Sequence, residues 1–290
     1  MPTLKRIKED LEFNQTLIEL VEVLKSISSS QFQAMKGKKE RFKVFIQSFE
    51  GFFRMIDLSE PRHPFATVGS DTIGIIMITS DEGFMGGLNT QVINSALEYR
   101  KKNPAELIVI GEKGAAYLEN IGEKFSSFPG IKEENKYQLV IKLRDYVIKQ
   151  KMAGRVGRVI LSYLEPVSFT YQRVKIMNIF PCVEIFKKKK EETMREGKKI
   201  IIESSLNQII EYLVATWITH VFFEIFEDSK ISEFAARTIS LEEKYQQLMR
   251  KEKILRHKYF YDFHRLIDRS MSNTFAAALL GRKRGMNNNG

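Results

Sequence analysis

The chain has 290 residues, of which 43% are hydrophobic and 28% charged, a balance that excludes an intrinsically disordered protein and allows one or two domains. Its only cysteine is Cys182, which excludes an intramolecular disulfide and a metal site built from cysteines. The net charge of +10 favours an acidic partner, such as a nucleic acid, an anionic membrane or an acidic protein surface, without choosing among them.

The N-terminal segment, residues 1–60, is predicted to be mostly one long helix. Apolar residues repeat on one helical stripe, which contains Leu4, Ile7, Leu11, Ile18 and Val21. A possible interruption lies at Gly37, because glycine costs about 1 kcal/mol relative to alanine inside a helix. Pro61 and Pro64 mark a linker. The segment also lacks the apolar core of a signal peptide.

The middle of the chain, residues 68–190, has the pattern of an α/β domain. We expect strands at 73–79, 107–110, 158–164 and 173–179, and helices at 86–101, 113–121 and 137–150. Alternation of strands and helices predicts a largely parallel sheet, and the last two strands are close enough to form an antiparallel hairpin. The basic run Lys187–Lys190 is interpreted as a solvated loop.

The C-terminal segment, residues 204–281, has no glycine or proline between Ser204 and Leu280 and would form a helix about 115 Å long. Leu241, Leu248 and Leu255 recur at heptad spacing, and Tyr245, Tyr259 and Leu266 form a second seam interrupted by Glu252. The alternative is two or three shorter helices. Its most apolar run contains charged residues, which favours a buried helix over a membrane span. Residues 282–290 are expected to form a disordered tail.

The order of these segments predicts the fold class. Two long helices from the two ends of the chain flank a compact domain, and they can meet only if they run antiparallel. We therefore expect an α/β protein with long helices: an antiparallel coiled coil of the N- and C-terminal helices with an inserted Rossmann-like α/β domain.

No known catalytic motif is present in the sequence. Neither phosphate-binding pattern, GxxxxGK[ST] or GxGxxG, occurs, and the four histidines lack metal-site spacing. The nearest candidate for an anion site is the loop from Thr79 to Asn89, but Asp81 and Glu82 would repel an anion. A tight turn that needs glycine for positive φ is the competing interpretation. An enzymatic reading would rest on Asp81 alone, and no cofactor is expected.

Two segments resemble the gamma subunit of F-type ATP synthases. The loop TSDEGFMGGLN resembles that family's TSDxGxxGGLN, and SKISEFAAR, which ends at Arg237, is similar to SKxSEHAAR with Phe234 in place of histidine. The candidate motif residues are Thr79, Ser80, Asp81, Gly83, Gly86, Gly87, Leu88, Asn89, Ser232, Glu233, Ala235, Ala236 and Arg237. The order of helix, α/β domain and long helix also fits, so the resemblance covers nearly the whole chain.

The resemblance implies a non-catalytic rotor shaft. In the family, the coiled coil turns inside a ring of three alpha and three beta subunits, and the α/β domain meets the epsilon subunit and the membrane rotor ring. The complex would lie at the cytoplasmic face of a membrane, with no nucleic acid and no transmembrane segment in this subunit. Two alternatives remain: the shaft of a divergent F-like ATPase that drives something other than proton transport, and a basic protein that binds nucleic acid or an anionic surface.

The chain departs from the family's usual residues at two places. Glu19 and Glu22 stand where lysines are usual, and Phe263 and His264 replace the Arg-Gln pair of the family's catch with a beta subunit. Between Lys244 and Arg269 the chain carries a net charge of +5. The residues expected to contact the ring are Leu24, Lys251, Arg256, Phe263, His264, Arg265 and Arg269.

Overall fold

The computed structural model describes the backbone of residues 4–53, 64–65, 67–182 and 206–287, and the side chains of 4–36, 64–65, 67–182 and 207–279. The chain forms two compact units. We call residues 1–26 with 241–290 the helix-pair unit, and residues 27–240 the α/β unit. Two long helices, α1 (Leu4–Phe53) and α6 (Leu206–Asn287), contribute to both units.

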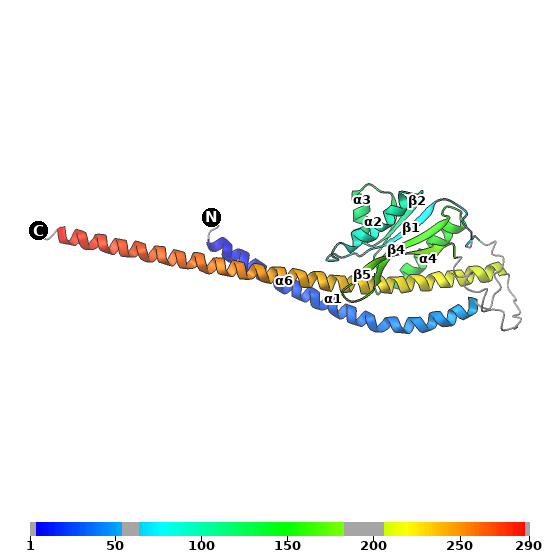
Figure 1. The fold of residues 1–290 in the computed structure, drawn as a ribbon, viewed down its shortest axis with the longest axis horizontal. Helices are drawn as coiled ribbons and strands as arrows, with labels where there is room; N and C mark the ends of the chain where they lie inside the picture. The colour runs from blue at the N-terminus through cyan, green and yellow to red at the C-terminus, as the bar shows by residue number, and fades with distance from the viewer. Residues whose placement is uncertain (1–3, 54–63, 66, 183–205, 288–290) are drawn as a thin grey trace. The chain divides into compact units, whose positions relative to one another are not determined.

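A five-stranded sheet of order β3-β2-β1-β4-β5 forms the centre of the α/β unit (Figure 1). The strands are β1 (Ile73–Ile78), β2 (Ala105–Ile110), β3 (Phe125–Phe128), β4 (Arg158–Pro166) and β5 (Gln172–Phe180). The first four are mutually parallel, and β5 pairs antiparallel with β4, which confirms the predicted sheet and hairpin. The sequence pattern missed β3, because its four residues include two serines and lie at the sheet edge.

Helices cover both faces of this sheet. They are α2 (Leu88–Arg100), α3 (Glu112–Asn120) and α4 (Lys136–Met152), together with the first part of α6. Strand side chains alternate between faces, so Ile76 joins one buried cluster with α4 and α6, whereas Ile75 joins a second cluster with α2 and α3. Both faces of the sheet are therefore buried, as expected for a parallel sheet.

The apolar run of α6 belongs to the first of these clusters. By length and composition, α6 contains an 18-residue segment apolar enough to cross a membrane, with a mean hydropathy of 1.5, and 44% of that segment is buried inside the protein. Val214, Ile218 and Phe222 are fully buried in the cluster with α4. Packing on the sheet thus buries part of this run, in line with the predicted buried helix.

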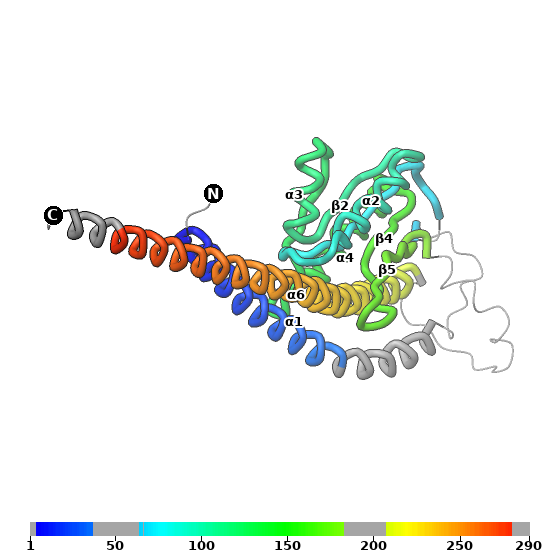
Figure 2. The backbone as a smooth tube through the Cα atoms, turned by 60° about the vertical axis from the view of Figure 1, so that its left-hand side comes forward, coloured from blue at the N-terminus to red at the C-terminus, as the bar shows by residue number. Residues whose placement is uncertain are grey.

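In the helix-pair unit, α1 and α6 run antiparallel. Lys25 Nζ lies 2.9 Å from Glu242 Oε2, and Gln15 Nε2 donates to Glu252 Oε1 at 3.3 Å. A later residue of α1 thus meets an earlier residue of α6, so the two helices run in opposite directions. The blue start of α1 lies beside the orange part of α6 in both ribbon and tube views (Figures 1 and 2). The predicted antiparallel helix pair is confirmed.

The seam between the helices follows the predicted heptads over most of its length. On α6 the less exposed residues recur at spacings of four and three, namely Leu241, Tyr245, Leu248, Glu252, Leu255, Tyr259 and Asp262. On α1, Ile7 and Val21 are buried, and so is Asn14, whose amide donates to the Leu248 carbonyl at 3.1 Å. A buried asparagine in a seam fixes helix register at a cost in stability.

The prediction that Leu266 continues the seam is wrong. Its side chain is 52% exposed. The register that pairs Gln15 with Glu252 places the first residue of α1, Leu4, level with about residue 263. Further along α6, the described part of α1 offers no partner, so the heptad pattern continues without a seam.

This register predicts a contrast between two truncations. Ile7→Ala removes a side chain that is 1% exposed and should destabilise the helix-pair unit by about 2–5 kcal/mol. Leu266→Ala should change stability by at most about 0.5 kcal/mol, as surface substitutions do. Thermal unfolding followed by circular dichroism measures both. Equal losses for the two variants would mean that the register is wrong.

One long helix is more continuous, and the other longer, than the sequence indicated. The backbone of α1 is helical through Gly37, where we expected a possible interruption, and α6 remains helical to Asn287, where we expected a tail from residue 282. The basic residues Arg282, Lys283 and Arg284 are good helix formers and offset the two nearby glycines. Of the two predicted linker prolines, Pro64 lies within the described residues and Pro61 outside them. The run Lys187–Lys190 also lies outside them.

Candidate functional site: the joint between the two motifs

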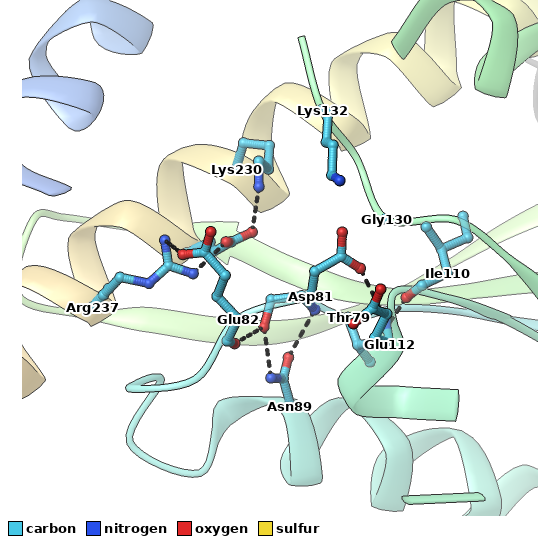
Figure 3. Close-up of polar contacts among 12 residues, drawn as sticks. Thr79, Asp81, Glu82, Asn89, Ile110, Glu112, Gly130, Lys132, Lys230 and Arg237 are labelled. Atoms are coloured by element: carbon cyan, nitrogen blue, oxygen red, sulfur yellow. Dashed lines mark hydrogen bonds and ion pairs between the residues drawn. The ribbon is translucent and has the colours of Figure 1, made fainter. Parts of the chain in front are cut away.

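The first motif begins where β1 ends and caps helix α3. The successive backbone N–H groups of residues 112–114 donate to Asp81 Oδ1, the Ser80 carbonyl and Thr79 Oγ1, at 3.0, 3.1 and 3.1 Å. Thr79 Oγ1 in turn donates to the Ile110 carbonyl at 2.7 Å (Figure 3). The first donors of α3 are the groups that would otherwise bind an anion. These donors are already satisfied here by the first motif itself.

The rest of the motif forms the turn into α2. Asn89 accepts the Ser80 N–H through Oδ1 at 3.2 Å and donates through Nδ2 to Ser80 Oγ at 2.8 Å. Gly86 and Gly87 have φ values of 58° and 85°, in the left-handed region that favours glycine. Leu88 is the first residue of α2. The interpretation of this segment as a tight turn is confirmed.

The second motif lies on α6 and reaches back to this turn. Arg237, which is 6% exposed, donates through Nε to the Gly83 carbonyl at 3.3 Å, and its Nη1 lies 3.0 Å from Glu82 Oε2. Its Nη2 donates to Glu233 Oε1, one helical turn earlier, at 2.6 Å. Segments about 150 residues apart in sequence therefore meet at one arginine (Figure 3).

The small residues of the second motif allow α6 to approach its neighbours. Ala236 is buried in the cluster shared with α2 and α3. Ala235 and Phe234 are buried with Phe32 and Met35 of α1 in a separate cluster of the α/β unit. Phe234 replaces the family's histidine, and its ring centre lies 5.9 Å from the Arg237 guanidinium. The substitution places an apolar face where a titratable group would otherwise stand.

Two further polar contacts tie α6 to the sheet and to α4. Ser232 Oγ, fully buried, donates to the Leu164 carbonyl at the end of β4 at 3.3 Å. Lys136, the first residue of α4, forms an ion pair with the buried Glu227 and lies 3.1 Å from Glu133. Burial alone would lower the pKa of Lys136, but hydrogen bonds to these two carboxylates raise it above its ordinary value.

Comparison with known proteins identifies the family. A family model described as ATP synthase matches residues 3–253. Curated relatives named ATP synthase gamma chain include one from Nitratidesulfovibrio vulgaris, 26% identical over 261 residues that cover 83% of this chain and 86% of the relative. Another, from Pelotomaculum thermopropionicum, is 22% identical over 250 residues with the same coverage. The chain belongs to the ATP synthase gamma-chain family.

Solved structures show the same fold at low identity. The rotor of the Euglena gracilis mitochondrial ATP synthase matches with a TM-score of 0.64 and 17% identity, covering 91% of this chain and 98% of that one. The Tetrahymena thermophila central stalk and c-ring structure matches with a TM-score of 0.59 and 18% identity, covering 78% and 99%. Family membership makes this chain the central rotor shaft of an F-type ATP synthase and a non-catalytic subunit of that complex.

The predicted site residues fall into two separate groups. The motif residues meet in the α/β unit, at the joint described above, and none of the described residues forms a cluster suited to a metal ion. The residues expected to contact the ring lie in the helix-pair unit. Our sequence reasoning missed Glu82 as a partner of Arg237 and treated it only as a charge that repels anions. No local sequence pattern indicates that Glu82 pairs with a buried arginine, because the pairing depends on the fold.

Proposed function

We propose that the helix-pair unit of this chain turns inside a ring of alpha and beta ATPase subunits, and that its α/β unit contacts an epsilon subunit and the membrane rotor ring. The rotation would couple ATP synthesis or hydrolysis in the ring to the membrane part of the complex. The observation that carries the proposal is the antiparallel pairing of α1 with α6 in a member of the gamma-chain family. The complex would be peripheral, at the cytoplasmic face of a membrane.

The residues that we propose as ring contacts are accessible to a partner. Lys251, His264, Arg265 and Arg269 are exposed, as is Arg256, whose side chain is 61% exposed. Phe263 is 38% exposed, and Leu24 is half-buried beside the seam. Most of these side chains therefore lie on the solvent-exposed surface of the helix-pair unit.

The end of α6 adds an apolar surface to this candidate contact. Leu266, Met271, Phe275 and Leu279 are 52%, 59%, 71% and 62% exposed, and Ile267 is 39% exposed. Exposed apolar surface on this scale marks an interaction site in a soluble protein. Because the described part of α1 does not extend this far, an apolar lining of the surrounding ring is the partner we propose for it.

A specific observation favours a second candidate, the shaft of an F-like ATPase that drives a machine other than a proton channel. Phe263 and His264 occupy the place of the family's catch, and Glu19 and Glu22 occupy positions where lysine is usual. Such substitutions would be expected if the ring around this shaft differed from the family's at the catch. The composition of the membrane part that accompanies the ring distinguishes the two candidates.

Recovery of the native complex tests the proposal. A tag at an exposed site of this chain should recover two P-loop ATPase-type subunits, each in threefold excess over the chain. This ratio is the one expected for a ring of three alpha and three beta subunits around one shaft. Quantitative mass spectrometry of the purified complex gives the ratio. Recovery of the chain at high yield without such subunits would contradict the proposal.

A further inference from the structure

The surface by which α6 contacts the rest of the α/β unit changes character along the helix. From Ile210 to Phe226 it buries apolar side chains against the sheet and α4. The next three turns bury many polar groups as well: Glu227, Asp228, Ser229, Ser232, Glu233, Arg237 and Thr238 are each at most 9% exposed. Burying charged groups is costly unless they are paired, so this polar stretch requires an explanation beyond packing.

Contacts from this stretch reach three different segments of the α/β unit. Glu227 pairs with Lys136 at the start of α4. Ser232 donates to the carbonyl of Leu164 at the end of β4. Arg237 contacts Glu82 and Gly83 in the loop that follows β1. Three separate segments of the α/β unit therefore contact this stretch within 11 residues of helix.

These contacts resist a motion that apolar packing resists only weakly. Hydrophobic burial is non-directional and depends on area, so a small turn of α6 about its own axis changes it gradually. Hydrogen bonds weaken steeply as their distance and angle depart from ideal values. A turn of α6 would also separate the buried Arg237 from Glu82 and Gly83, leaving only its ion pair with Glu233, which turns with the helix.

Arg237 is the best placed of these groups to prevent a turn of α6 about its own axis. Its planar guanidinium offers donors in a fixed fork. Glu233, in turn held by Lys230 at 2.8 Å, orients that fork from within the helix. The Nη1 group of the same guanidinium meets Glu82, as Figure 3 shows. Its Nε donates to the Gly83 carbonyl, which also lies outside the helix. We call the four residues Glu82, Gly83, Glu233 and Arg237 the arginine clamp.

We propose that the arginine clamp fixes the rotational angle of α6 relative to the rest of the α/β unit. In this torsional role it makes the α/β unit follow the rotation of α6. Arg237 is a positioning residue in this role, and it acts by fixing the angle of the helix on the domain. The inference rests on the proposed function, because it presupposes that the ring turns α6 and that the α/β unit carries the load.

A single-molecule measurement on the assembled complex tests this inference. The ring is immobilised, and a bead is attached to a cysteine introduced by Ile121→Cys, an α/β-unit position that is 48% exposed, while the native Cys182 is buried. Angular fluctuation of the bead during the pauses of ATP-driven rotation reports the stiffness between ring and domain. We compare the parent complex with Arg237→Met, Arg237→Lys and Glu82→Gln.

Arg237→Met should increase the angular variance by about twofold or more, because it removes charge-assisted hydrogen bonds, which are roughly twice as strong as neutral ones. Arg237→Lys should recover part of the stiffness. Glu82→Gln, at a side chain that is 72% exposed and tolerant of change, should give a smaller increase. ATP hydrolysis without load should stay near the parent rate, because the ring still turns α6.

Arg173→Met is the matched control. It removes an arginine–carboxylate pair of 2.5 Å between Arg173 and Glu165, which lies inside the β4–β5 hairpin and does not include α6. Its angular variance should equal that of the parent. Unchanged variance in both Arg237→Met and Glu82→Gln would overturn the torsional role. A bead that never rotates in the parent complex, despite ATP hydrolysis, would instead contradict the proposed function on which the inference rests.

Discussion

Truncating α6 after Leu255 should remove most of the torque that the complex delivers, whereas Arg256→Glu should change ATP hydrolysis by at most about fivefold. The truncation deletes most of the proposed ring contacts and the exposed apolar end of α6 together. The charge reversal changes one side chain that is 61% exposed, and exposed ion pairs contribute only about 0–1 kcal/mol. On this account the shaft is driven by steric contact, and charge sets a preference among angles.

Both variants are compared in reconstituted complexes by ATP hydrolysis and by the torque on a viscous load. Assembly is checked first, because the truncation also removes Tyr259 and Asp262 from the seam with α1. If Arg256→Glu abolished rotation while the truncated shaft still delivered torque, the steric account would fail. A specific ionic catch would then have to replace it.

Gly111→Ala should destabilise the α/β unit by about 4 kcal/mol or more, among the largest effects of a single substitution. Gly111 precedes α3 with a φ of 98°, and a Cβ at this position would lie 2.4 Å from the Thr79 carbonyl oxygen. The neighbour is backbone and cannot move without displacing the first motif from α3. Urea unfolding measured by fluorescence of Trp217, the only tryptophan, follows this unit.

Gly122→Ala is the matched control. Gly122 also has a positive φ, of 74°, but a Cβ there would have no atom within 4 Å. Its cost should be only the backbone term, about 1–2 kcal/mol. Equal losses for the two variants would show that the contact with Thr79 does not matter, and that the capping loop has room to move.

Features that depend on local pattern could be predicted from the sequence. The buried run Ile73–Ile78 and the hairpin of β4 and β5 follow from apolar, β-branched residues between turn signals. The long C-terminal helix follows from the lack of glycine and proline between Ser204 and Leu280. The heptads at Leu241, Leu248 and Leu255 correctly indicated the face of α6 that meets α1.

Features that depend on contacts between distant segments could not. Leu266 continues the heptad pattern, but whether it finds a partner depends on the register of α1, which no local pattern reveals. The same holds for the joint, where Arg237 meets Glu82 only after the sheet has brought the loop beside α6. Asn14 is a third case, because a polar residue in an apolar stripe carries no local sign that it is buried in the seam.

Direct observation of rotation tests whether this chain is the turning part of the complex. Complexes are immobilised through the ring, ATP is added, and a bead on the α/β unit is followed by light microscopy. We expect stepwise rotation in one direction that stops when ATP is removed. Steady ATP hydrolysis by the same complexes with a stationary bead, in the absence of load, would contradict it.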